Sequence, residues 1–351
     1  MARIAVVVFN LGGPATGDDV RPFLFNLFND RAIIGLPQPL RLFLATLIAR
    51  RRAPVARAIY AKLGGGSPIL ENTMAQAAAL EAALKDDNSW NESRVFPCMR
   101  YWHPRAGEVA AAVLAFAPDR VVLLPLYPQF STTTTASSLA EWHRAAGRRG
   151  LTARTTTVCC YPVEEGFVAA LARLARGPWR EALAQGPARL LMSAHGLPKR
   201  IVARGDPYPD QIEETARAVA RRLALGDGEW RVCYQSRVGP LEWIGPATDE
   251  ELRRAGRDKV AVVVLPLAFV SEHSETLVEL DIEYRHVATA AGVPGYWRVP
   301  AVGTTPEFIA GLAGLVRRAL EDPRPVVSHP GPRRCLADAG CCPQPIPRTG
   351  P

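Results

Sequence analysis

The sequence predicts an α/β protein made of two similar halves, each with a parallel sheet covered by helices on both faces. Its 351 residues suit two domains better than one. Apolar runs rich in Val, Ile and Leu alternate along the chain with helical patterns, which is typical of parallel sheets buried on both faces. Three strand segments of the first half also recur, in the same order, in the second half.

The expected strands are short apolar runs at residues 4–9, 120–126, 189–193, 231–235 and 259–267. Between them lie helical patterns whose apolar residues recur three and four positions apart, at residues 74–84, 106–116, 166–176 and 211–225. A last helix begins at Thr304 and Pro306, which suit an N-cap and the first helical turn, and extends to Leu320.

The repeat pairs residues 4–14 with 190–198, 95–101 with 232–238, and 121–130 with 262–269. The three offsets are 184, 137 and 141 residues, so the repeat rests on the order of the segments and not on sequence identity. Because ligands of open α/β sheets bind beyond the carboxyl ends of the strands, we expect a crevice between the halves. We place the domains at residues 1–155, 156–303 and 304–351, the last being a returning helix and a tail rich in Cys and Pro.

The composition of the chain excludes several classes of protein. Hydrophobic residues at 48% and charged residues at 22% describe a folded protein and exclude wholesale disorder. The net charge of +8 comes from 38 Arg and only 4 Lys, and the Arg residues are scattered apart from Arg50–Arg52, so nucleic-acid binding is not predicted. We find no signal peptide, and the apolar run at residues 42–49 is less than half of the roughly 20 residues that a spanning helix needs. We therefore expect the seven cysteines to lie in a reducing compartment, where thiols serve metals or catalysis.

Two Gly-rich segments do not predict nucleotide binding. Residues 63–68 lack the Lys-Ser/Thr of a phosphate loop, and residues 11–14 lack the GxGxxG spacing of a dinucleotide turn. Glycines that permit tight turns or close backbone approach are the simpler interpretation.

Two polar constellations follow expected strands. His195 comes directly after one strand, and five carboxylates with His273 come within residues 272–283, after another. If the second segment is helical, Glu275, Glu279 and Glu283 fall on one stripe. A solvated acidic face is the ordinary explanation of such a stripe, but its position at a strand's carboxyl end favours a site.

A His and a Glu that face each other suit a divalent cation such as ferrous iron. A neutral imidazole can also accept a proton near pH 7. The chain has no HExxH or CxxC motif, which disfavours a zinc hydrolase.

Aromatic residues at strand ends would suit a flat aromatic ligand, although core packing is the alternative for each one. They comprise Tyr101, Trp102, Tyr127, Phe130, Trp243 and Phe269.

Residues 36–52 combine an apolar stripe, which includes Leu40, Phe43 and Leu47, with the Arg50–Arg52 run. This pattern fits either a buried core helix or an interfacial helix whose Arg residues meet anionic lipid headgroups.

Taken together, these motifs resemble the ferrochelatases over nearly the whole chain and in the same order. The segments that carry the resemblance are residues 10–14, 63–68, 100–101, 127–139, 193–198, 234–250 and 266–284. The resemblance implies a lyase that inserts ferrous iron into a porphyrin to form haem, without ATP, in a cleft between two Rossmann-like, chelatase-type halves. It favours protoporphyrin IX as the substrate and leaves coproporphyrin open.

The resemblance also implies roles for individual residues. His195 and Glu275 would form the iron-site pair, with His195 as the leading proton acceptor and His273 beside them. The surrounding acidic array would consist of Glu272, Glu279 and Glu283. The porphyrin edge and pocket would be contacted by Arg52, Tyr60, Ser67, Arg100, Tyr101, Trp243 and Phe269.

Two further features follow from the resemblance. The lip at residues 36–52 would place a cytoplasmic protein peripherally on the inner face of the cell membrane, and a homodimer is left open. The tail would hold a 2Fe-2S cluster through Cys335, Cys341 and Cys342. Thr132 occupies the position of the animal form's internal ligand, so the fourth ligand would be Cys159 or Cys160; a loose tail with free thiols is the alternative.

Two other functions are compatible with the same residues. A related chelatase that inserts cobalt or nickel into a tetrapyrrole is the first. A porphyrin or haem carrier without catalysis is the second, but a row of buried carboxylates would be needless in a carrier.

Overall fold

The computed structural model describes residues 2–85, 89–237, 239 and 241–329. Within this range the chain forms two compact units. The first unit comprises residues 2–127, 131–159 and 315–326, and the second comprises residues 128–130, 160–314 and 327–329. The chain therefore crosses from one unit to the other more than once.

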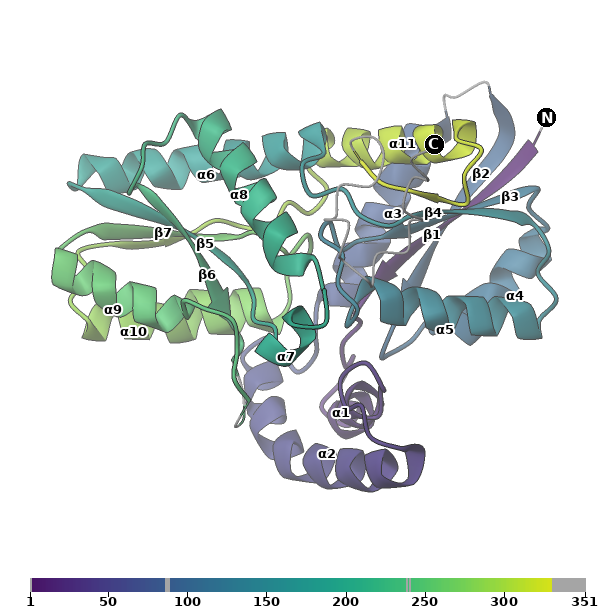
Figure 1. The fold of residues 1–351 in the computed structure, drawn as a ribbon, viewed down its shortest axis with the longest axis horizontal. Helices are drawn as coiled ribbons and strands as arrows, with labels where there is room; N and C mark the ends of the chain where they lie inside the picture. Colours follow the sequence, from purple (N-terminus) through teal and green to yellow (C-terminus); the bar gives the residue numbers. More distant parts are fainter. Residues whose placement is uncertain (1, 86–88, 238, 240, 330–351) are drawn as a thin grey trace, which may run out of the picture. The chain divides into compact units, whose positions relative to one another are not determined.

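The first unit is built on a five-stranded sheet in the order β2-β1-β3-β4-β9, and the pairs β1–β2, β1–β3 and β3–β4 are parallel. Its strands are β1 (Ala2–Asn10), β2 (Trp90–Met99), β3 (Arg120–Pro125), β4 (Arg154–Val158) and β9 (Val326–Val327). Its helices are α1 (Val20–Phe28), α2 (Gln38–Ala61), α3 (Ile69–Lys85), α4 (Ala106–Phe116) and α5 (Thr135–Arg148). Helices α4 and α5 cover one face of this sheet and α3 lies on the other (Figure 1).

The second unit is built on a four-stranded parallel sheet in the order β6-β5-β7-β8. Its strands are β5 (Ala188–His195), β6 (Trp230–Gln235), β7 (Ala261–Pro266) and β8 (Tyr296–Arg298). Its helices are α6 (Glu165–Ala184), α7 (Lys199–Val202), α8 (Tyr208–Leu223), α9 (Thr248–Asp258), the π-helix η1 (Glu275–Glu283) and α10 (Tyr284–Ala290). Helix α11 (Pro306–Glu321) starts in this unit and ends in the first.

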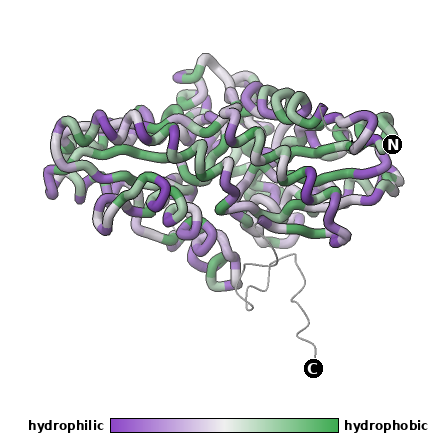
Figure 2. The backbone as a smooth tube through the Cα atoms, turned by 90° about the horizontal axis from the view of Figure 1, so that it is seen from above, coloured by the Kyte–Doolittle hydropathy of each residue, from purple (hydrophilic) through white to green (hydrophobic). Residues whose placement is uncertain are grey.

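The two sheets share one topology, which confirms the prediction of two similar parallel α/β halves. In both, the first strand of the unit lies between the second and the third, and the fourth follows at the same edge. The apolar runs are buried as predicted: Ile4 to Phe9 in β1 are at most 2% exposed. Figure 2 shows the same alternation, with hydrophobic strands and helices that carry one polar side.

The sheet register corrects one part of the predicted repeat. Phe9 lies opposite Cys98 and Pro125, whereas Ser193 lies opposite Cys233 and Pro266. The offsets of 184 and 141 residues therefore hold for the first and third strands, but the second strands are related by 135 residues and not by 137. A shift of two residues keeps every side chain on the same face of a strand, so the apolar pattern could not detect it.

The lip segment is part of a longer helix than predicted. Helix α2 begins at Gln38 and continues through Pro54 to Ala61, and Ala45, Ala49 and Ala53 form its buried side. Among the helices of the described ranges, none is both long and apolar enough to span a membrane.

Candidate active site

His195 and Glu275 come together at the carboxyl end of the second unit's sheet. His195 is the last residue of β5, and Glu275 opens the π-helix that follows the neighbouring strand β7. The Nε2 atom of His195 lies 3.6 Å from Oε1 of Glu275, and the two side chains are 39% and 31% exposed. The Nδ1 atom of His195 lies 2.6 Å from the carbonyl oxygen of Gly196. Because a carbonyl can only accept, Nδ1 carries a proton and Nε2 faces the carboxylate.

A second imidazole contacts the other oxygen of Glu275. The Nε2 atom of His273 lies 3.5 Å from Oε2, and its Nδ1 donates to the carbonyl oxygen of Ser271 at 3.0 Å. His273 is buried, and its ring packs against that of Phe269 with a centroid distance of 4.8 Å. Glu275 therefore has one imidazole on each carboxylate oxygen.

The charges of this cluster are coupled. Burial alone would lower the pKa of His195, but the Glu275 carboxylate outweighs it and raises the pKa to about 9. Burial would likewise raise the pKa of Glu275, but His195 and His273 hold it well below its usual range. At neutral pH the pair is an imidazolium and a carboxylate.

The acidic segment forms a π-helix and not the α-helix that the stripe assumed. Its hydrogen bonds span five residues, so side chains four apart no longer align closely. Glu279 accepts hydrogen bonds from the Ser236 amide (2.7 Å), the Ser236 hydroxyl (2.5 Å), Gln235 (3.1 Å) and Tyr284 (3.0 Å). Burial and the nearby Glu275 raise the pKa of Glu279. Glu283 is exposed at the far end of the helix.

Glu272 has a cationic partner that the sequence reasoning missed. Its Oε1 atom accepts from Arg298 at 2.8 Å and from the Ala301 amide at 3.0 Å. Arg298 also pairs with Asp281 at 3.1 Å, so it joins the start of the acidic segment to the π-helix. Within the described ranges, no group of three or more His, Cys, Asp or Glu side chains is arranged to hold a metal ion.

Arg100 and Tyr101 belong to a closed cluster in the first unit. Arg100 pairs with Asp30 at 2.9 Å and donates to the Ser137 hydroxyl at 2.8 Å, while the Tyr101 hydroxyl donates to Asp30 at 2.8 Å. Ser137 also donates to Asp30. Tyr101 is 1% exposed, so its ring is part of the core, and burial raises the pKa of its hydroxyl well above the ordinary value. Asp30 stands in none of the motifs named above and Ser137 lies within the 127–139 segment, but neither was predicted as a site residue.

The other predicted porphyrin residues are spread over both units. In the first unit, Arg52 is exposed with its guanidinium 6.0 Å from the Phe28 ring centre, and Tyr60 is buried in the core between α1 and α2. In the second unit, Trp243 and Phe269 are both half-buried. Trp243 forms an isolated bridge with Pro198, just beyond His195.

The two Gly-rich segments pack against each other, so close backbone approach is the correct interpretation. The Ser67 amide donates to the carbonyl oxygen of Pro14 at 2.8 Å. A Cβ atom on Gly66 would lie 2.1 Å from the carbonyl oxygen of Ala15, and one on Gly13 would lie 2.5 Å from Cβ of Ser67. Any side chain at either glycine would separate the two loops.

Cys159 and Cys160 are buried directly after β4. The amide of His329, the last described residue, donates to the carbonyl oxygen of Cys160 at 3.0 Å. Cys335, Cys341 and Cys342 lie outside the described residues.

Comparisons with known proteins agree on one family. The family model described as Ferrochelatase matches residues 3–320. The chain is 54% identical to the ferrochelatase of Caulobacter vibrioides (strain NA1000 / CB15N), with 97% of each chain covered, and 52% identical to that of Phenylobacterium zucineum (strain HLK1), also with 97% of each covered. It is 49% identical to that of Wolbachia sp. subsp. Drosophila simulans (strain wRi), over 89% of this chain and 98% of the relative.

Solved structures share the fold at low identity. The sirohydrochlorin chelatase SirB of Bacillus subtilis subspecies spizizenii, in complex with cobalt, has a TM-score of 0.54 at 14% identity, over 92% of this chain and 97% of SirB. SirB from Bacillus subtilis with Fe3+ has a TM-score of 0.52 at 13% identity, over 91% and 96%.

Proposed function

Because the chain belongs to the ferrochelatase family and is a lyase that makes haem by inserting iron into a porphyrin, we propose that His195, Glu275 and His273 form the centre of that reaction. The observation that carries the proposal is the placement of Glu275, which has an imidazole on each carboxylate oxygen at a strand's carboxyl end. The substrate-free pair is ionised and accessible, which suits an incoming cation.

Insertion requires a porphyrin to lose two pyrrole protons as ferrous iron enters. In the proposed reaction, Glu275 attracts the iron by its charge. The positive charge of the metal then opposes the imidazolium of His195 and lowers the pKa of His195, because like charges at short distance disfavour the protonated form. His195, which is 39% exposed, can then release its proton to solvent and accept one pyrrole proton at Nε2. Once it has passed this proton to solvent, it can accept the second in the same way.

We extend the proposal to the acidic array. Glu279 is the next carboxyl group along the π-helix, and its raised pKa suits a group that takes up a proton near Glu275. Glu283 would continue this path to the exposed end of the helix. The ion pair with Arg298 favours a positioning role for Glu272, at the start of the segment that carries His273 and Glu275.

The porphyrin contacts are proposed in the same way. Phe269 and Trp243 are half-buried aromatic residues near the His195 and Glu275 pair and suit one wall for the macrocycle. In the first unit, Arg52 is accessible for a propionate, and Tyr60 and Ser67 follow along the same chain segment. The burial of Tyr101 supports an indirect role, in which it holds Asp30 and through it Arg100.

The test of the centre is His195→Ala. Iron insertion is followed anaerobically by the shift of the porphyrin Soret band, and we expect a loss of about a hundredfold or more, since a positioned base contributes 10²–10⁴. His103→Ala is a matched control, because His103 pairs with Glu108 at 2.9 Å on an exposed surface. Near-normal insertion by His195→Ala would contradict the assignment.

The natural porphyrin and metal are tested in the same assay. We propose protoporphyrin IX and ferrous iron, and competition with coproporphyrin, cobalt or nickel measures each preference directly. Protein that binds the porphyrin without turnover would favour the carrier alternative.

We also propose that the protein is cytoplasmic and attaches to the inner face of the cell membrane through the lip at residues 36–52. On α2, Leu40 is 58% exposed and Phe43 is 71% exposed, which is a high exposure for large apolar side chains. Replacement of Arg50, Arg51 and Arg52 by Gln should weaken binding to anionic vesicles in a salt-sensitive manner. Unchanged binding would refute the electrostatic part. A homodimer is a separate proposal, tested by sedimentation.

Finally, we propose that the tail cysteines hold a 2Fe-2S cluster together with Cys159 or Cys160. The hydrogen bond from His329 to Cys160 supports this, since Cys335 is the sixth residue after His329 and six residues can span at most about 20 Å. Iron and acid-labile sulfide should be found in anaerobically purified protein. Separate Cys159→Ser and Cys160→Ser variants distinguish the two ligands, and a colourless, iron-free preparation would contradict the cluster.

A further inference from the structure

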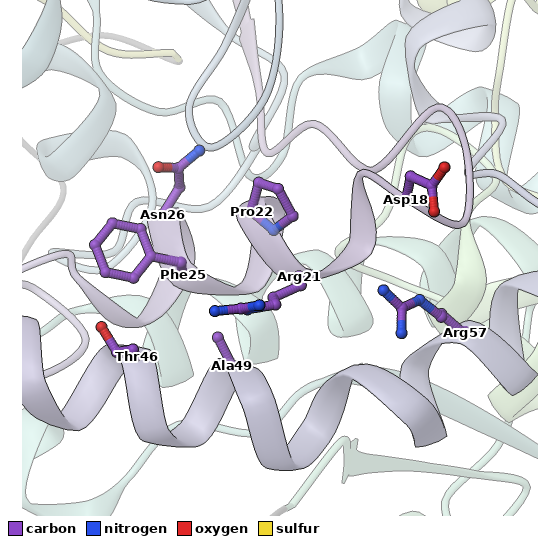
Figure 3. A pocket seen from close by; sticks show the side chains of 8 residues that line it. All are labelled: Asp18, Arg21, Pro22, Phe25, Asn26, Thr46, Ala49 and Arg57. Carbon is purple, nitrogen blue, oxygen red and sulfur yellow. The ribbon is translucent and has the colours of Figure 1, made fainter.

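A cavity of about 550 Å³ lies between α1 and α2 in the first unit, and the residues that line it include none of the proposed iron or porphyrin contacts (Figure 3). Its lining comes from both helices and from the loop before α1, and comprises Asp18, Arg21, Pro22, Phe25, Asn26, Thr46, Ala49 and Arg57. The volume is within the range of small-molecule sites.

Two guanidinium groups share this cavity. Figure 3 shows the Arg21 side chain lying along the space between the helices and the Arg57 side chain entering from α2 near Asp18. Among the residues that the structure describes, Arg21 has no hydrogen-bond or ion-pair partner, and Arg57 uses Nε to donate to the carbonyl oxygen of Gly17 at 3.0 Å. With Asp18 counted, the lining carries a net positive charge, which favours an anion.

The cavity adjoins the exposed apolar side of α2. Phe43, Thr46, Arg50 and Arg57 are three, four and seven residues apart in turn, so they lie along one flank of the helix. Arg52 is nine residues beyond Phe43, about two and a half turns, and so lies on the opposite flank. The cavity is therefore separate from the flank that carries the predicted porphyrin residue Arg52. In a helix that lies along a membrane with Phe43 in the acyl region, Thr46 and Arg57 on the same flank would face the phosphate layer.

We propose that this cavity binds the phosphodiester of a membrane phospholipid, with Arg21 and Arg57 as the ligands of its oxygens. Guanidinium groups bind phosphate through paired hydrogen bonds that an ammonium group cannot reproduce. Phe43 and Leu40 then lie beside the acyl chains of the same lipid. The inference rests on the proposed membrane attachment and adds a defined headgroup site to it.

The experiment measures binding of the full chain to vesicles of phosphatidylcholine and phosphatidylglycerol at three to one. The double variant Arg21→Lys with Arg57→Lys keeps the charge and removes the paired geometry, and we expect its binding to be about fivefold weaker. The matched control, Arg148→Lys with Arg149→Lys, makes the same change at an exposed pair away from α1 and α2 and should bind like the wild type. Unchanged thermal unfolding and unchanged iron insertion with detergent-solubilised porphyrin show that the variants are folded.

Each other outcome overturns the proposal in a recognisable way. If the Lys variant binds vesicles as well as the wild type does, the attraction is general charge and the site is wrong, while membrane attachment stands. If millimolar inorganic phosphate displaces the protein from vesicles in the wild type and not in the Lys variant, the cavity is a free-anion site. If neither the wild type nor Phe43→Ser binds vesicles, membrane attachment itself fails and the site fails with it.

Discussion

The two sheets carry different clusters at equivalent places. By the sheet register, Arg100 and Tyr101 after β2 correspond to Gln235 and Ser236 at the end of β6. Each pair holds a carboxylate from another part of its own unit: Arg100 and Tyr101 hold Asp30, whereas Gln235 and Ser236 hold Glu279. The same position in the two sheets therefore holds an acidic side chain just beyond the strand ends.

The two clusters differ in the charge of the groups that donate hydrogen bonds to the carboxylate. Asp30 pairs with the guanidinium of Arg100 and is 8% exposed, so its cluster is a buried ion pair. Among the described residues, Glu279 accepts hydrogen bonds only from neutral donors, and its pKa is raised by burial and by Glu275. The Glu275 and His195 pair beyond it is about one third exposed. The first cluster is a buried ion pair, whereas the second keeps carboxyl and imidazole groups that can still exchange protons.

The largest effect should come from Glu275→Gln, which removes the negative charge that contacts both His195 and His273. We expect iron insertion to fall by about a hundredfold or more, and the pKa of His195 to fall from about 9 to below 6.5, because burial then dominates. Activity and an NMR titration of the His195 ring measure the two effects. A His195 pKa that stays near 9 in this variant would show that the Glu275 carboxylate does not control it.

The next effect is on stability. Asp30→Asn leaves the Arg100 guanidinium without its buried partner, and we expect a loss of about 3–5 kcal/mol in the free energy of unfolding. Glu108→Gln, at the exposed pair with His103, should cost less than about 1 kcal/mol. Urea unfolding of both variants gives the comparison, and equal costs would mean that the first cluster is not structural.

Glu279→Gln should cost less than Asp30→Asn, about 1–2 kcal/mol, because its donors are neutral and an amide can keep some of their hydrogen bonds. The same unfolding experiment measures it. If Glu279→Gln lowers the free energy of unfolding more than Asp30→Asn does, the proposed contrast between charged and neutral donors is wrong.

The smallest effect is the pH dependence of stability. The pKa of His195 is raised to about 9, so its stabilisation is fully present below the ordinary value of 6.5 and is lost as pH rises through about 9. The pKa of Glu275 is lowered, so its stabilisation is present above 4.5 and is lost as pH falls. The difference in unfolding free energy between the wild type and Glu275→Gln should be greatest between pH 4.5 and pH 6.5 and should vanish above pH 9. Solvent screening keeps it to about 1 kcal/mol. A difference that grows above pH 9 would contradict the pairing.

Much of this could be predicted from the sequence because buried parallel strands appear as continuous apolar runs, and such runs placed His195 and Glu275 at strand ends. The π-helix could not be predicted, since its wider turns show no periodic signal that distinguishes them from an α-helix. Asp30, Ser137 and Arg298 were missed for a different reason. Each is a polar residue far along the chain from its partner, and only the folded backbone brings them together.

Cys98 and Cys233 occupy matching places in the two sheets, and burial is the main cause that raises the pKa of each thiol to about 12. At neutral pH both are protonated and enclosed, so alkylating reagents should modify them only after unfolding. Cys159 and Cys160 are buried as well, so maleimide labelling of the native chain reports on the three cysteines of the tail. The labelling rate of this protein thus gives a direct readout of thiol occupancy in the tail, with the four buried thiols as a built-in marker of unfolding.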